Sequence, residues 1–119
     1  LSPAGQALMA KARSAYGTDA MDIPAMAGFV GGWTFFHDVL PNLSGQVTSE
    51  SVRSAALQVD VPVGDSINGG GVKFGADGSL DEGQNTRAAA VIGQWQGVGN
   101  MKVVFPPAYA TGTPIYGEI

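Results

Sequence analysis

The fold of this chain depends on one stretch, PAMAGFVGGWTFFHDVL, which covers residues 24–40 and is followed by Pro41. Proline is tolerated in the first turn of a helix and cannot continue one, so Pro24 and Pro41 predict the two ends of a helix. Its residues are apolar on nearly every side, which is typical of a buried helix. Gly31 and Gly32 each lower helix stability by roughly 1 kcal/mol relative to alanine. We therefore expect another backbone to pack closely against this helix.

A membrane-spanning helix is the competing interpretation of the same stretch. Spanning a bilayer takes about 20 consecutive apolar residues. Here the apolar run is shorter, and three glycines, His37 and Asp38 interrupt it. The stretch is therefore expected to form a core helix, with Met26, Phe29, Val30, Trp33, Phe36 and Leu40 on its main apolar stripe.

Composition limits the classes of protein to which the chain can belong. With 119 residues, of which 45% are hydrophobic, it is one small domain or part of a larger one. A net charge of −4 with only six Lys and Arg argues against nucleic acid as a partner. The absence of cysteine excludes disulfides and a thiol nucleophile. Because the sequence begins at Leu1 without a methionine or a signal peptide, we expect a mature or cut product.

The remaining segments predict two more helices and a hairpin. Ser2 and Pro3 start the first helix and Gly17 ends it, while Thr48 caps a helix that buries Val52, Ala55, Ala56 and Val59 and leaves Arg53 solvated. From Gly69 onward the pattern changes to short strands, turns and loops. The expected strands cover residues 71–74, 88–96 and 101–105, with residues 97–100 as the hairpin loop and the tail as loop.

Catalytic and metal-binding patterns are weak in this sequence. His37 is the only histidine, so it cannot share a zinc site with another histidine or a cysteine, and no Gly-x-Ser-x-Gly elbow supports a serine nucleophile. The glycines at 69–71 lack the following Gly-Lys-Ser/Thr of a phosphate loop. The acidic residues Asp77, Asp81 and Glu82 lie in a stretch that lacks the glycine at the sixth position and the terminal glutamate of a calcium loop, and we expect a solvated turn there. We expect no catalytic residues, no metal and no cofactor.

The start of the central helix is the best candidate for binding a ligand. Free N–H groups and the helix dipole favour an anionic group there, such as a solute carboxylate. Met26 and Phe29 could supply an apolar wall, and Asp22 lies in the loop that leads into this turn. The alternative is that Met26 and Phe29 pack in the core. Trp95, between Gln94 and Gln96, could also line a site, although a strand tryptophan more often packs against protein.

The order of these segments resembles one family, the type I periplasmic binding proteins of the branched-chain amino acid (Leu/Ile/Val) group. The resemblance covers nearly the whole chain and rests on six segments in the family's order. These are Ala15-Tyr16-Gly17, Gly28-Phe29, Ser51-Val52-Arg53-Ser54-Ala55-Ala56-Leu57, Gly71-Val72-Lys73-Phe74 with Asp77-Gly78, Val91-Ile92-Gly93-Gln94-Trp95-Gln96, and Val103-Val104-Phe105-Pro106.

The resemblance implies an α/β fold that is part of a two-lobed protein, with three helices and then a terminal β-hairpin. Residues 1–86 would complete the helical part of the first lobe, and residues 87–119 would add the hairpin and tail to the second. Asn85, Thr86 and Arg87 would form the hinge crossing between the lobes. In this family, residues at the turn that holds Asp22, Met26 and Phe29 approach the ligand, which makes Met26 the best single candidate.

The implied function is solute binding for an ABC importer, without catalysis. The partners would be a small solute (an amino acid or a similar carboxylate or amide), an ABC permease and the upstream part of the same protein, of which this chain would be a fragment. The implied location is periplasmic or extracellular, with a lipid anchor upstream of Leu1 left open. A ligand-sensing regulatory domain of the same fold is the alternative function. A small α/β hydrolase ranks behind both, because the sequence offers no pair of nucleophile and base.

Overall fold

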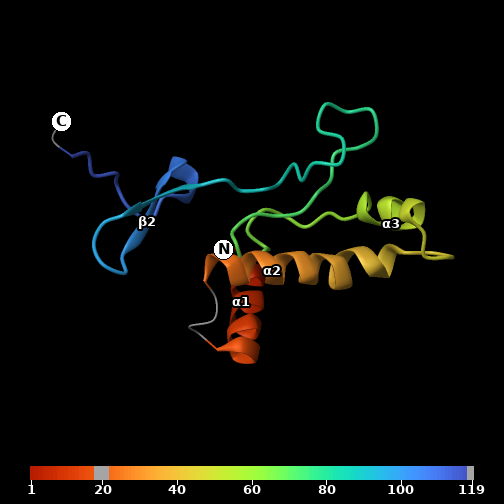
Figure 1. Ribbon diagram of the computed structural model, residues 1–119, viewed down its shortest axis with the longest axis horizontal. Helices are drawn as coiled ribbons and strands as arrows, with labels where there is room; N and C mark the ends of the chain where they lie inside the picture. The colour runs from red at the N-terminus through yellow and green to blue at the C-terminus, as the bar shows by residue number, and fades with distance from the viewer. Residues whose placement is uncertain (18–21, 118–119) are drawn as a thin grey trace. The chain divides into compact units, whose positions relative to one another are not determined.

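The computed structural model describes residues 1–17 and 22–117, and within them the protein is mixed α/β (Figure 1). It has three α-helices and one antiparallel sheet of two strands in the described part of the chain. The chain divides into two units, Leu1–Ala89 with the helices and Ala90–Ile119 with the sheet. This division lies slightly beyond the predicted boundary between residues 86 and 87.

Helix α1, Pro3–Tyr16, begins and ends where the sequence predicts. The hydroxyl of Ser2 accepts a hydrogen bond from the Gly5 N–H at 3.0 Å, as an N-cap should. At the other end Gly17 has a φ of 89°, which glycine adopts without steric cost, and its N–H donates to the Arg13 carbonyl. Both ends are thus determined by residues within one turn of the boundary.

The first turn of α1 packs on a loop that lies far along the chain. The Ser2 N–H donates to the Gly64 carbonyl at 3.0 Å, and the Ser2 hydroxyl donates to Asp65. At Gly5, a Cβ atom would lie only 2.1 Å from the Gly64 carbonyl oxygen. Because no side chain fits there, glycine at position 5 allows the helix and the loop to make contact.

The central helix begins one residue before the predicted start and continues past the predicted end. Helix α2 covers Ile23–Trp33, a π-helical segment η2 covers Thr34–Val39, and a 3-10 turn η3 covers Leu40–Asn42. The π geometry is visible in the bond from the Leu40 N–H to the Phe35 carbonyl. Pro41 therefore lies inside the last 3-10 turn, where its missing N–H is tolerated.

The expectation that the central helix is buried was wrong for the described chain. Helix α2 has no buried residue, and in η2 only Val39 is buried. Phe36, which we placed on the inward stripe, is 70% exposed, whereas Val39, from the opposite side, is 4% exposed. No described atom outside the helix lies within 4 Å of a Cβ atom placed on Gly28, Gly31 or Gly32. The close backbone contact that these glycines predict is thus absent from the described residues.

The hydrophobic core lies between the end of the central helix, helix α3 and the loop that follows it. Helix α3, Ser49–Ala56, begins with a capping box in which Thr48 and Ser51 satisfy each other's backbone N–H groups. The buried cluster is small, and several partly buried side chains pack around it. The cluster consists of Val39, Ala55, Val59 and Val72, and the side chains packed against it are Leu43, Ala56, Val61 and Phe74. Of the four residues predicted to face inward from α3, Ala55 and Val59 are buried, and Val52 and Ala56 are partly so.

The predicted strand at residues 71–74 is only partly formed. Val72 bridges Val61, and Phe74 bridges Asn85, both in antiparallel fashion, but neither bridge extends into a ladder. Gly71 has no room for a side chain, since a Cβ atom there would lie 2.4 Å from the Val61 carbonyl oxygen. Single bridges replace a regular sheet because turns and glycines interrupt this segment on both sides.

The second unit contains the predicted hairpin. Strand β1, Ile92–Trp95, pairs with β2, Met101–Phe105, in antiparallel register, with Gln94 opposite Lys102. The first strand is shorter than the predicted 88–96, and the ladder is irregular between Ile92 and Gly93. The loop closes through a bond of 2.9 Å from the Gln96 N–H to the Asn100 carbonyl.

The C-terminal tail crosses the hairpin from β2 to β1. The N–H groups of Thr111 and Gly112 donate to the Val103 carbonyl on β2, at 2.8 and 3.3 Å. On β1, Gln94 exchanges two bonds with the main chain of Ile115, at 2.6 and 2.8 Å. The predicted loop is therefore held against both strands by hydrogen bonds.

Across residues 1–17 and 22–117, no helix combines the length and the apolarity that crossing a membrane requires.

Candidate functional site

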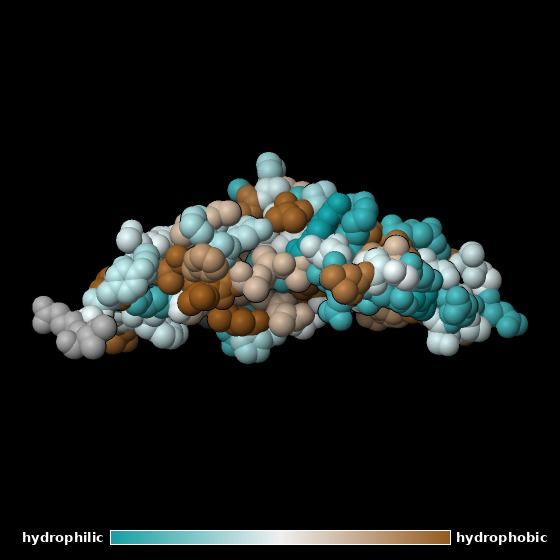
Figure 2. Space-filling view, turned by 90° about the horizontal axis from the view of Figure 1, so that it is seen from above, coloured by the Kyte–Doolittle hydropathy of each residue, from teal (hydrophilic) through white to brown (hydrophobic). Residues whose placement is uncertain are grey.

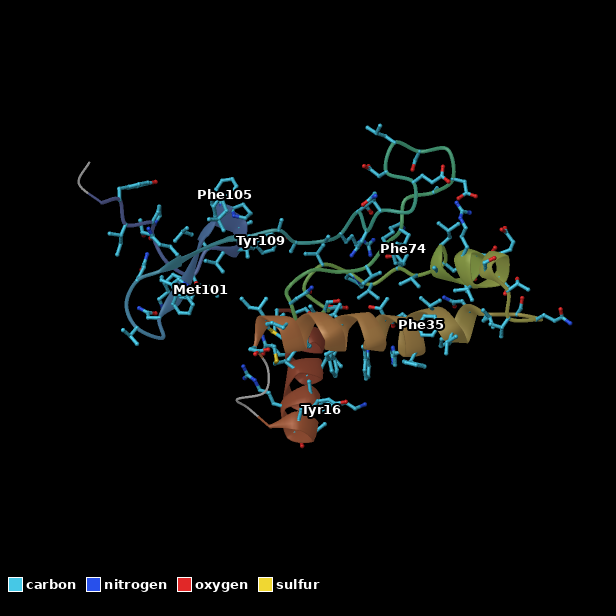
Figure 3. All side chains as sticks on the ribbon, viewed as in Figure 1. Tyr16, Phe35, Phe74, Met101, Phe105 and Tyr109 are labelled. Carbon is cyan, nitrogen blue, oxygen red and sulfur yellow. The ribbon has the colours of Figure 1, made fainter. Side chains whose placement is uncertain are left out.

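An open apolar hollow runs along one face of helix α2. Its volume is about 660 Å³, and its lining consists of aromatic side chains and residues with little or no side chain. The lining residues are Tyr16, Ala25, Gly28, Phe29, Gly32, Trp33 and Phe36. Except for Tyr16, at the end of α1 (Figure 3), these residues follow the i, i+3, i+4, i+7 spacing of a single helix face.

The small residues of this face form the floor of the hollow and the aromatic residues form its walls. Gly28 and Gly32 are four residues apart and carry no side chain, so they leave the backbone of α2 accessible. Phe29 and Trp33 stand beside them with ring centroids 5.7 Å apart and nearly parallel planes. Such a floor and walls suit either a flat apolar group or another element that packs closely.

A ladder of rings strengthens one wall of the hollow. Tyr16 from α1 meets Phe29 edge to face at 6.3 Å, and Trp33 stacks in turn on His37 at 4.4 Å. The ammonium group of Lys11, also on α1, lies 5.0 Å from the Trp33 ring centroid. These contacts connect α1 to α2 and hold the aromatic side chains in one orientation.

A second apolar hollow of about 370 Å³ lies on another side of the central helix. Val30 and Phe35 line it from the central helix, Val52 lines it from α3, and Phe74 lines it from the loop that follows α3. Figure 3 shows Phe74 on the side of the central helix where α3 lies. Figure 2 shows hydrophobic residues at the surface among hydrophilic ones. Because the two apolar hollows lie on different sides of the central helix, the helix is uncovered on two sides within the described chain.

The predicted site residue Asp22 acts as the N-cap of α2. Its carboxylate accepts a bond from the Ala25 N–H at 2.9 Å, and its carbonyl accepts one from the Met26 N–H at 2.9 Å. Pro24 has no N–H to offer. Few main-chain donors are therefore left in this turn for a solute carboxylate, and Asp22 itself fills part of the role that we assigned to an anionic ligand.

The other two predicted binding residues occupy different surroundings. Met26 and Phe29 are both partly exposed, and neither belongs to the buried core. Phe29 lines the open hollow, while Met26 is not among the residues that line it. Contact of either residue with a solute stays a prediction.

The predicted hinge residues are bonded to the helical unit. The Thr86 N–H donates to the Lys73 carbonyl at 2.8 Å, and the Arg87 carbonyl accepts from the Gly71 N–H at 3.0 Å. The Asn85 side chain donates to the Gly71 carbonyl and accepts from the Lys73 and Arg87 N–H groups. Any hinge motion that used these residues would have to break these bonds or begin beyond them.

Two clusters of ion pairs lie on the helical unit. Arg53, expected to be solvated, is exposed but forms ion pairs with Asp77 and Glu82. Its hydrogen bond lowers the pKa of the Asp77 carboxyl. On the other cluster, bonds from Lys73 (2.6 Å) and Arg87 lower the pKa of Asp60. The acidic turn at 77–82 is thus tied to α3, and no group of metal-ligating side chains occurs in the described residues.

The two glutamines beside Trp95 bind the tail of the chain. Gln96 donates to the Thr113 carbonyl at 2.7 Å and to the Gln94 side chain at 3.0 Å. Trp95 is 68% exposed, so within the described residues it packs neither in a core nor in a pocket. These amides are therefore used within the hairpin unit.

Sequence reasoning missed most of the residues that line the open hollow. Trp33 and Phe36 were assigned to the apolar stripe of the central helix, and Tyr16 was given no site role. The signal that could have identified them is the alternation of small and aromatic residues at Ala25, Gly28 and Gly32 and at positions 29, 33 and 36. A strictly core-facing stripe would not need glycine at two successive turns.

Comparison of the chain with protein-family models, with curated proteins and with solved structures finds no match.

Proposed function

We propose that residues 1–119 form part of the solute-binding component of an ABC importer outside the cytoplasm. The observation that carries the proposal is the central helix, which is strongly apolar yet has no buried residue in α2 and lies beside two open apolar hollows. Exposed apolar surface of this extent is typical of an interface or a ligand site. The order of the segments, which resembles the branched-chain amino acid group, supports the same conclusion.

In this proposal the uncovered faces of α2 have two uses. One face packs against the upstream part of the same protein, which supplies the sheet that the helix needs for burial. Gly28, Gly31 and Gly32 then accommodate the backbone of that sheet or of a neighbouring helix. The first turn of α2, with Met26, points toward the solute, and a permease receives the loaded protein.

The solute is an amino acid or a similar small carboxylate or amide. The open hollow of about 660 Å³ is within the range of about 300–1,000 Å³ that is usual for small-molecule sites. The upstream part would cover the hollow at Gly28 and Gly32, and the end of the hollow beside Phe29, next to the first turn of α2, would be left for the solute. Because the hollow is open, a second lobe has to close over the solute and exclude water. Residues 1–86 would belong to one lobe and residues 87–119 to the other, with Asn85, Thr86 and Arg87 at the crossing.

The experiment is calorimetric titration of the complete polypeptide that contains residues 1–119 with a panel of amino acids, amides and small carboxylic acids. We expect one member of the panel to bind saturably with one site. Met26→Ala should weaken that binding by roughly tenfold, since burying a methionine side chain contributes about 1.5–3 kcal/mol. Leu80→Ala is the matched control, because Leu80 is fully exposed.

Two results would contradict the proposal. One is the absence of binding to any member of the panel by a protein that is folded and monomeric. The other is equal affinity of the wild-type protein and the Met26→Ala variant, which would remove the first turn of α2 from the site.

A further inference from the structure

The four residues between Arg87 and strand β1 have no regular secondary structure, although the sequence predicts a strand over residues 88–96. They are Ala88, Ala89, Ala90 and Val91, and we call them the alanine segment. Strand β1 begins only at Ile92, and the boundary that divides the chain into two units falls within the segment, after Ala89.

The main chain of the alanine segment makes almost no hydrogen bonds within residues 1–17 and 22–117. The Ala88 N–H donates to the Asn85 carbonyl at 3.3 Å, and the other main-chain groups of the segment have no partner there. Ala88, Ala90 and Val91 are exposed, and Ala89 is half-buried. Susceptibility to proteolysis depends on the burial and the hydrogen bonding of the backbone. A protease could therefore bind this segment without first unfolding a helix or a strand.

The side chains of the segment determine which class of protease could cleave it. Three successive alanines offer only methyl groups to the pocket that receives the side chain before the cleaved bond. A small pocket, as in elastase, accepts a side chain of this size, whereas the pocket of trypsin carries an aspartate and selects lysine or arginine. The segment itself contains no basic residue.

Arg87, directly before the segment, is withheld from a protease of the trypsin type. Its guanidinium forms an ion pair with Asp60 and donates to the Val61 carbonyl at 2.9 Å, and its side chain is only 26% exposed. Its own carbonyl, which such a protease would attack, accepts a bond of 3.0 Å from the Gly71 N–H. Cleavage after Arg87 thus requires several bonds to break first.

The other basic residues are also poorly placed for trypsin. Four of the six lie in helices or in β2, and the remaining two both pair with Asp60. The four are Lys11, Arg13, Arg53 and Lys102, and the two are Lys73 and Arg87. The folded chain should therefore resist a protease that requires a basic side chain.

Exposure alone does not distinguish the alanine segment, because Val98 in the hairpin loop is fully exposed. The backbone of that loop is constrained, however. The Gln96 N–H donates to the Asn100 carbonyl at 2.9 Å, and Gly97 and Gly99 both have positive φ. Val98 is therefore a matched comparison for the effect of hydrogen bonding on cleavage.

We propose that the alanine segment is a processing site for a protease with a small, apolar specificity pocket. The bond hydrolysed is that between Ala90 and Val91, since both residues are exposed. Water supplies a hydroxyl group to the Ala90 carbonyl carbon and a proton to the Val91 nitrogen, which leaves a carboxylate and an amino group. The cut divides the chain close to the boundary of its two units. This proposal does not rest on solute binding.

The test is brief digestion of the folded chain of residues 1–119 with pancreatic elastase or with trypsin, followed by mass spectrometry of the fragments. Each rate is divided by the rate for the same bond in a synthetic peptide of residues 83–95, which removes the intrinsic preference of the protease. Elastase should cleave after Ala90 within about tenfold of the peptide rate, and faster than it cleaves after Val98. Trypsin should cleave after Arg87 at least about tenfold more slowly than in the peptide, because several hydrogen bonds protect that bond.

Two variants separate access to the backbone from the pairing of Arg87. Ala90→Lys gives trypsin a basic side chain at an exposed position, so trypsin should now cleave the folded chain after position 90. Asp60→Ala removes the partner of Arg87 and should speed cleavage after Arg87 about two- to fivefold, as for an exposed ion pair. The rate after Arg13 in α1 is the reference in this variant, because a general loss of stability would raise both rates.

Four results would overturn the proposal. The first is a folded chain that elastase leaves intact at residues 88–91. The second is cleavage after Val98 as fast as cleavage in the alanine segment. The third is trypsin cleavage after Arg87 at the rate of the peptide. The fourth is an Ala90→Lys variant that is folded and resists trypsin at position 90. None of these results bears on solute binding at the first turn of α2.

Discussion

Replacing glycine by alanine should have opposite effects on the free energy of unfolding at Gly5 in α1 and at Gly28 in α2. A Cβ atom at Gly5 would lie 2.1 Å from the Gly64 carbonyl oxygen, whereas at Gly28 no described atom outside the helix lies within 4 Å. Alanine stabilises a helix interior by about 1 kcal/mol relative to glycine, partly because it restricts the unfolded chain. This gain is available at Gly28, and at Gly5 it is opposed by a clash with a main-chain atom.

The sizes of the two effects follow from these distances. Gly5→Ala should cost about 1–3 kcal/mol of unfolding free energy, the usual penalty for overpacking, because α1 must move away from the Gly64 loop. Gly28→Ala should gain up to about 1 kcal/mol in the chain of residues 1–119. In a complete solute-binding protein the sign at Gly28 should reverse, because the proposed cover would pack on this glycine.

The assay is urea denaturation followed by far-ultraviolet circular dichroism, with light scattering at each protein concentration. Wild type, Gly5→Ala and Gly28→Ala are compared in the chain of residues 1–119 at the lowest workable concentration, and again in the complete polypeptide. If Gly28→Ala destabilises the monomeric chain of residues 1–119, the conclusion that this face of α2 is uncovered is refuted. A stabilising effect in the complete polypeptide would refute the proposed cover.

Four further predictions concern the hinge, an ion pair, the aromatic wall and association. Thr86→Pro should weaken solute binding in the complete protein by calorimetry, because it removes a main-chain donor that makes a bond of 2.8 Å; unchanged affinity would count against a crossing there. Bonds from two basic side chains lower the pKa of Asp60 below 3.8, so their stabilisation is present above that pH and is lost as pH falls through the lowered pKa. Asp60→Asn should accordingly lower the melting temperature near neutral pH and not in strong acid, unlike the control Asp81→Asn. In the chain of residues 1–119, Phe29→Ala should lower the free energy of unfolding, measured by urea denaturation, by about 0.5–1.5 kcal/mol for the lost ring contacts and by a further amount for the partial burial of the ring. A loss typical of a core phenylalanine would show that this face is covered. The chain of residues 1–119 alone should associate in light scattering, and Phe36→Glu should reduce that association; a compact monomer with a cooperative melt would contradict the need for a cover.

Both ends of α1, the start of α3 and the hairpin could be predicted from the sequence because their causes are local. Ser2, Thr48 and Gly17 act on backbone groups within one turn. The loop at 97–100 joins two strands that are adjacent in the chain. In each case the residues that decide the structure lie a few positions from the boundary, so no knowledge of distant contacts is required.

The orientation of the central helix could not be predicted in the same way. Its sequence is apolar on nearly all sides, so periodicity does not distinguish the face with Val39, which is buried, from the face with Phe36, which is exposed. That choice depends on α3 and on the loop with Val72, which pack against the end of the helix. The change from α- to π-helix at Thr34 also has no local signal that we recognised.

For the candidate sites, too, sequence spacing predicts some of the residues and tertiary packing brings in the others. The aromatic and small residues of α2 can be assigned to one helix face from their spacing, but Tyr16 joins them only because α1 packs beside that face. The hollow of about 280 Å³ between α1, η2 and residues 60–66 brings Asp38 together with Asp65 and Ser66, which lie beyond α3 in the chain, and the pairing of Arg53 with Asp77 spans a similar separation. Side chains so distant in sequence meet only when the chain closes long loops, and the packing of the whole helical unit determines which loops close. The sequence thus determined the local elements, and tertiary packing determined which of their faces and charges lie together.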